Sequence, residues 1–136
     1  MATDNKQKHL EFIQGAINRM ASNLFLLKGW TITLIAALFA LAAKDAKLTY
    51  FIVAYFPAMV FWLLDGYFLM QERCFRALYD HVRQLPEGQI DFSMDTRPFK
   101  KQPIKSYRKA VFSPTLLMYY LSLIVVMGVL MYFLTR

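Results

Sequence analysis

The sequence is poor in the residues that most catalytic and metal sites require. It holds one cysteine, Cys74, so no disulfide can form within the chain. Its two histidines, His9 and His81, have no metal-ligand spacing with each other or with Cys74. The five glycines form no phosphate-binding loop, and the serines form no nucleophile-elbow pattern. We therefore expect neither an enzyme nor a metal or cofactor site.

Acidic residues are also scarce, with nine Asp and Glu against sixteen Lys and Arg, which gives a formal net charge of +7. Apolar residues are abundant instead, at 57% of the 136 residues, whereas soluble domains have about 45–50%. They concentrate in three segments, 23–43, 48–70 and 114–135. Each reaches the roughly 20 residues that a helix needs to cross a bilayer. The sequence predicts a single all-α membrane domain with three transmembrane helices.

The uneven distribution of Lys and Arg predicts the orientation of the chain. Three spans put the N-terminal segment and residues 72–113 on one side, and these carry three and nine basic residues. The other side carries three, which are Lys44, Lys47 and Arg136. Because short cytoplasmic loops are enriched in Lys and Arg, we expect the N-terminus in the cytoplasm and the C-terminus outside. The polar start predicts no cleavable signal peptide.

Two charged residues interrupt the first two apolar segments. Asp65 stands in the run FWLLDGYFL, and Lys28 lies in the first segment. Counted from the short turn at 44–47, the two lie within ~5 Å of each other along the helix axes. Charged groups within a bilayer usually pair or face a wet interior. We predict a Lys28–Asp65 ion pair; the alternatives are that Asp65 lines a wet pathway, or that both side chains extend to the membrane surface.

Residues 6–22 have the pattern of an amphipathic helix on the cytoplasmic side, continuous with the first span. Its apolar residues recur every three or four positions, at Leu10, Ile13, Ile17 and Met20. Either this helix lies on the membrane surface, or copies from several subunits pack their apolar stripes into a bundle. The second span keeps a helical pattern as far as residue 84, so its extension is a natural partner for the helix.

Residues 85–113 are predicted to form an irregular, basic cytoplasmic loop, with Ser113 and Pro114 starting the third span as N-cap and N1 residue. From 97 to 109 the loop holds basic and aromatic residues and no acid. Such a stretch binds either anionic lipid headgroups, or phosphate and single-stranded nucleic acid. The candidate residues are Arg73, Arg76, Arg97, Lys100, Lys101, Lys105, Arg108 and Lys109.

Small residues recur along one side of the first span and allow another helix to approach closely. They are Gly29, Thr33, Ala36, Ala37 and Ala40. This face either packs within the chain or lines the contact and pore between subunits. Three helices bury few lateral faces, so we expect a homo-oligomer.

The segments EFIQGAINRMASNLFLLKGWTITLIAALFALAA and FPAMVFWLLDGYFLMQERCFRALYDHVR, within 11–83, resemble a family of small bacterial membrane proteins. The most specific parts are RM, KGW and the pattern FW-LDGYFL-QER-FR-LYD, which include Lys28, Asp65, Glu72 and Arg73. Proteins that look like this occur in two-gene anti-phage systems of the Hailong type. The resemblance implies a homo-oligomeric channel in the bacterial inner membrane, controlled by a nucleic-acid product of a nucleotidyltransferase-like partner.

We therefore expect a channel effector that an anionic nucleotide or nucleic-acid ligand gates from the cytoplasm. One alternative is a non-conducting membrane anchor or accessory subunit for a cytoplasmic partner. The other is a small proton-coupled exporter in which Asp65 binds the proton.

Overall fold

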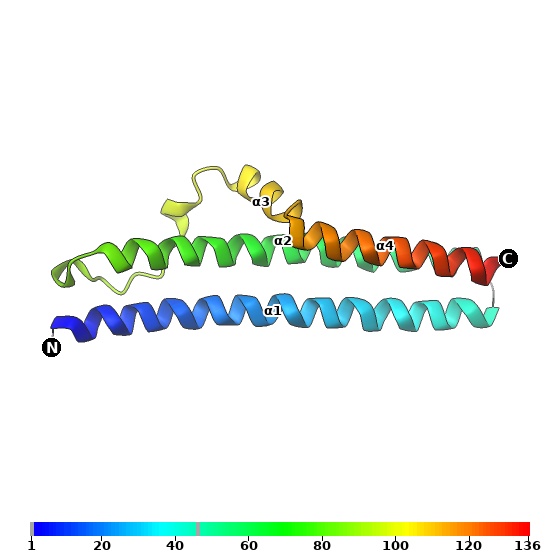
Figure 1. Cartoon of the computed structure of the whole chain (residues 1–136), viewed down its shortest axis with the longest axis horizontal. Helices are drawn as coiled ribbons and strands as arrows, with labels where there is room; N and C mark the ends of the chain where they lie inside the picture. Colours follow the sequence, from blue (N-terminus) through cyan, green and yellow to red (C-terminus); the bar gives the residue numbers. More distant parts are fainter. Residues whose placement is uncertain (1, 46) are drawn as a thin grey trace.

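The computed structural model describes residues 2–45 and 47–136, and these are helical with irregular connections (Figure 1). Helix α1, Ala2–Asp45, and helix α2, Leu48–Gln84, form a long antiparallel hairpin. Helix α4, Pro114–Thr135, packs beside the half of α2 that is nearer the hairpin turn, so the C-terminus lies at the turn. All three helices are long and apolar enough to cross a membrane. The all-α prediction with three candidate spans is confirmed.

The half of the molecule near the turn has its own apolar core. Ile35, Phe39 and Ala42 of α1 pack against residues of α2, and Met127 of α4 joins the same cluster. The α2 residues in this cluster are Phe51, Ala54 and Ala58. The two alanines leave room for neighbouring helices to approach closely, which is how helices associate where lipid removes the hydrophobic driving force. This core holds the three candidate spans together.

The predicted helix 6–22 is the first part of the continuous helix α1. Ile13 and Ile17 are buried against Leu78 and Val82 of the α2 extension. Leu10 packs at the edge of this cluster and Met20 is half-buried. The apolar stripe is therefore occupied by the chain's own α2. Its position on the cytoplasmic side of a membrane stays a prediction.

The expectation of an irregular loop at 85–113 is wrong for its last third. Helix α3, Pro103–Val111, follows the short 3₁₀ helices η1, Glu87–Gln89, and η2, Arg97–Phe99. The many basic residues of this segment favoured a loop in the sequence. Its apolar side is buried only where α2 covers it, and that tertiary contact is not visible in the sequence. Ala110 accordingly packs against Met70 and Cys74 of α2. Ser113 Oγ accepts the Leu116 amide at 3.5 Å and caps α4, as predicted.

Candidate functional site

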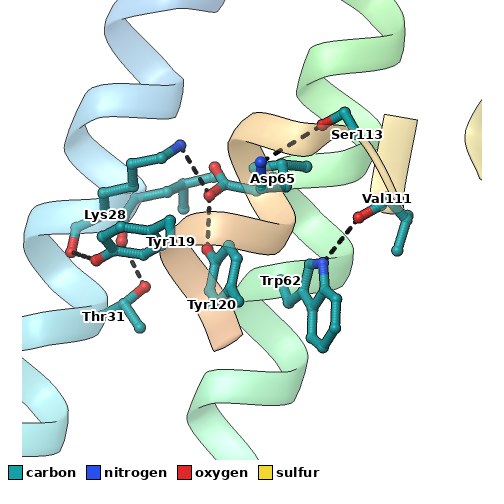
Figure 2. A network of polar contacts seen from close by, with 10 residues as sticks. Lys28, Thr31, Trp62, Asp65, Val111, Ser113, Tyr119 and Tyr120 are labelled. Carbon is teal, nitrogen blue, oxygen red and sulfur yellow. Dashed lines mark hydrogen bonds and ion pairs between the residues drawn. The ribbon is translucent and has the colours of Figure 1, made fainter. Parts of the chain in front are cut away.

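Asp65 joins all three long helices at one point, which we call the polar junction and define as Lys28, Asp65 and Tyr120 (Figure 2). The Asp65 side chain is fully buried in the middle of α2. Lys28 Nζ of α1 lies 3.1 Å from Asp65 Oδ2. The Tyr120 hydroxyl of α4 donates to the same oxygen at 2.6 Å. The two charges that the sequence spacing paired are thus in contact, with a third helix attached to them.

Two further aromatic residues hold the polar junction in place. The Tyr119 hydroxyl donates to the Lys28 carbonyl at 2.9 Å, and the Tyr119 ring lies 5.5 Å from Lys28 Nζ. Trp62 stacks on Tyr120 with ring centroids 5.6 Å apart and planes 7° apart. None of the roles of Trp62, Tyr119 and Tyr120 was predicted from the sequence. Adjacent tyrosines inside an apolar segment were the available signal, since a buried phenolic hydroxyl needs a partner.

One oxygen of the buried carboxylate is left open. Both donors, Lys28 and Tyr120, use Asp65 Oδ2. Asp65 Oδ1 has no hydrogen-bond partner in the described part of the chain. A buried carboxylate oxygen without a donor costs free energy, so this atom can accept a proton or a further donor.

Helix α3 is attached to α2 at residues that lie beside the polar junction. The Trp62 indole N–H donates to the Val111 carbonyl at 2.9 Å, as Figure 2 shows. The Tyr107 hydroxyl donates to the Leu63 carbonyl at 2.9 Å. Gly66 admits Val111 against the α2 backbone, because a Cβ at Gly66 would collide with the Val111 side chain. A displacement of α3 would therefore act on the residues around Asp65.

A basic groove runs between α2, η2 and α3. It consists of a large hollow of about 480 Å³ and an adjoining small hollow of about 150 Å³. Lys105 and Lys109, one helical turn apart on α3, line the large hollow together with Lys101, which precedes α3. Arg73 and Lys109 line the small one. Every charged residue that lines either hollow is a cation, so the groove suits a phosphate-bearing ligand.

The other predicted basic residues lie outside this groove. Arg76 pairs with Glu72 at 2.7 Å, and Arg97 pairs with Asp95 at 2.9 Å. The hydrogen bond from Arg97 lowers the pKa of the Asp95 carboxyl. Arg108 is exposed and lines neither hollow of the groove; it lies beside Ile104 in a separate hollow. Half-buried Lys100 acts on Cys74, whose pKa is raised by burial and partly lowered by that positive charge.

The small-residue face of α1 points away from the rest of the chain. Its five predicted members, Gly29, Thr33, Ala36, Ala37 and Ala40, are all exposed. A shallow hollow of about 300 Å³ lies over Gly29, between Phe25 and Trp30. Of the two alternatives, packing within the chain is thus wrong. Contact between subunits stays a prediction.

No protein-family model, curated protein or solved structure matches this chain.

Proposed function

We propose that the protein is a homo-oligomeric ion channel of a bacterial inner membrane, opened or closed from the cytoplasm by an anionic ligand. The observation that carries this proposal is the chain of contacts that connects the basic groove to the polar junction through Trp62. Lys105 and Lys109 lie on α3, as does Val111, which accepts the Trp62 indole N–H. Trp62 in turn stacks on Tyr120, which binds Asp65. The lysines that would bind the anion are thus connected to the contact among the spans through Val111, Trp62 and Tyr120.

The gating step follows from where a ligand would act. A ligand shifts a conformational equilibrium only if it binds the two states with different affinity. An anion in the large hollow would bring Lys101, Lys105 and Lys109 together and hold α3 in one position against α2. When α3 shifts, Val111 moves on Gly66 and Trp62 loses its carbonyl acceptor. We assign the exposed face of α1 to the contact and pore between subunits.

The biological setting comes from the resemblance to Hailong membrane subunits. In that setting, a cytoplasmic nucleotidyltransferase-like partner makes the nucleotide or single-stranded nucleic acid that controls the channel. Channel activity would then depolarise an infected cell. The chain itself would carry out no catalysis and hold no cofactor.

Ion flux tests the proposal. The full chain is reconstituted in liposomes, and flux is measured with and without short DNA or RNA strands on the side of α3. We expect flux that changes with the strand, and loss of that response in Lys101→Gln/Lys105→Gln. The matched control, Arg83→Gln/Arg108→Gln, removes two exposed cations outside the groove and should respond normally. Inserted, oligomeric protein that conducts under no condition would favour the non-conducting anchor.

The open oxygen of Asp65 favours a second candidate, a proton-coupled exporter. Asp65 Oδ1 is buried without a partner and lies among the candidate spans. In an exporter, Asp65 would be the residue that binds and releases the coupled proton. Asp65→Asn that keeps its protein level while pH-dependent transport disappears would support the exporter over the channel.

A further inference from the structure

We infer that the small hollow of the basic groove binds the phosphate of an anionic phospholipid from the inner leaflet. The small hollow is the part lined by Arg73 and Lys109, with Ser106, Met70 and Cys74 beside them. This inference goes beyond the proposed function, because it requires no conduction and no soluble ligand.

The residues that line the small hollow include two cations and no acidic residue to balance their charge. Arg73 comes from α2 and Lys109 from α3, so the folding of α3 onto α2 brings two cations together. The nearest acid along α2 is Glu72, which is held by Arg76 at 2.7 Å. The Ser106 hydroxyl adds a hydrogen-bond donor. Two cations and a hydroxyl around one hollow are typical of a site for phosphate oxygens.

The two hollows differ in size. The small hollow has a volume of about 150 Å³ and the large one about 480 Å³. A phosphate group is small enough for the small hollow. A nucleotide, with its base and sugar, has more room in the large hollow, and the small one suits a phosphate whose remaining parts lie elsewhere.

The depth of the small hollow favours a lipid as the source of that phosphate. About 20 helical residues cross the hydrocarbon, so the span that begins at Leu48 reaches the inner boundary near residue 68. Arg73 lies five residues further, about 7 Å beyond that boundary. The headgroup layer extends about 5–8 Å on each side of the hydrocarbon. Arg73 is therefore level with the phosphates of the inner leaflet.

The end of α3 supplies an apolar neighbour for the lipid. Phe112, its C-cap residue, is 59% exposed and lies 6.3 Å from Trp62, measured between ring centroids. Trp62 lies six residues before residue 68, about 9 Å inside the hydrocarbon, so Phe112 lies at the depth of the acyl chains. A phospholipid with its phosphate on Arg73 and Lys109 would place its chains near Phe112. Bound in this way, the lipid would hold α3 against α2.

Native mass spectrometry of the full chain in detergent tests this inference by titration with phosphatidylglycerol or phosphatidylcholine. We expect phosphatidylglycerol to bind about tenfold more tightly or better, since each surface Lys or Arg contributes to binding anionic lipid. Arg73→Gln/Lys109→Gln should abolish that preference, and Arg83→Gln/Arg108→Gln should retain it. An equal loss in both double variants would mean general surface charge and would overturn the site.

A competition with the wild-type chain separates a lipid from a soluble anion and does not depend on the folding of any variant. Glycerol 3-phosphate carries the headgroup phosphate without acyl chains. We expect it not to displace phosphatidylglycerol at equal concentration, because it lacks the contact near Phe112. Equal competition by glycerol 3-phosphate or inorganic phosphate would identify a soluble anion site and overturn the lipid assignment.

Discussion

At the residue scale, Asp65 is the group on which the arrangement of the spans depends. Its carboxylate lies 3.1 Å from Lys28 Nζ and is fully buried. Replacing one member of a buried pair leaves the other charge uncompensated, which costs about 3–5 kcal/mol. Lys28 keeps 24% of its side chain exposed, so we expect Asp65→Asn to cost about 3 kcal/mol. Thermal unfolding in detergent and the amount of protein in the membrane measure this loss.

The matched control for Asp65→Asn removes both charges. Lys28→Met combined with Asp65→Asn leaves no buried charge, and we expect it to recover at least part of the lost stability. If the double variant is no more stable than Asp65→Asn, the ion pair is not what makes Asp65 necessary. Its contact with Tyr120 would then have to carry the effect.

Neighbouring tyrosines provide a second test at this scale. The Tyr120 hydroxyl donates to the Asp65 carboxylate at 2.6 Å, whereas the Tyr119 hydroxyl donates to the neutral Lys28 carbonyl at 2.9 Å. Hydrogen bonds to charged groups contribute about 1.5–3 kcal/mol and neutral ones about 0.5–1.5 kcal/mol. We expect Tyr120→Phe to lower the free energy of unfolding more than Tyr119→Phe does. Equal effects would show that Tyr120 contributes mainly by packing against Trp62.

At the element scale, the close approach of α3 to α2 requires a glycine at position 66. A Cβ at Gly66 would collide with the Val111 side chain and would lie 3.2 Å from its Cα. We expect Gly66→Ala to push α3 away from α2, at a cost of about 1–3 kcal/mol. Cys74 reports this movement, because α3 buries it through Ala110. Maleimide should label Cys74 faster in Gly66→Ala than in the wild type.

Gly128→Ala is the control for this substitution in the same protein. The added Cβ would meet the Tyr55 hydroxyl at 3.7 Å, an ordinary contact. Alanine in a helix is favoured over glycine by about 0.5–1 kcal/mol, so this variant should be as stable as the wild type or slightly more so. Cys74 labelling should not change. Unchanged labelling in Gly66→Ala as well would mean that Val111 adjusts without moving α3.

The elements also show why part of the site was predictable and part was not. The long helices and the Lys28–Asp65 contact could be predicted from the sequence. Helical rise and the cost of a charge in lipid are general rules, and applying them requires only the positions of the residues along the chain. Helix α3 and the groove depend on which surface of α2 covers Tyr107 and Ala110, and this is a tertiary contact. Tyr120 reaches Asp65 only because α4 returns beside α2. No spacing within the third span carries that information.

At the scale of the whole molecule, the fold determines which basic residues lie together at one end. The hairpin turn and the C-terminus lie at one end, and the N-terminus at the other (Figure 1). Lys47 and Arg136 must therefore lie on the same side of any membrane that the three helices cross. The excess of Lys and Arg at the opposite end predicts that Lys47 and Arg136 face outward.

Single-cysteine labelling of intact bacterial cells tests this orientation. In a Cys74→Ala background, we expect a membrane-impermeant maleimide to label Lys47→Cys and Arg136→Cys. Lys101→Cys, which is exposed beside α3, should be labelled only after the cells are permeabilised. Protection of both Lys47→Cys and Arg136→Cys, with labelling of Lys101→Cys, would show an inverted chain despite its charge. Labelling of only one of Lys47→Cys and Arg136→Cys would contradict three full spans. The chain between these two residues would then cross the membrane an odd number of times, whereas α2 and α4 together should cross it twice.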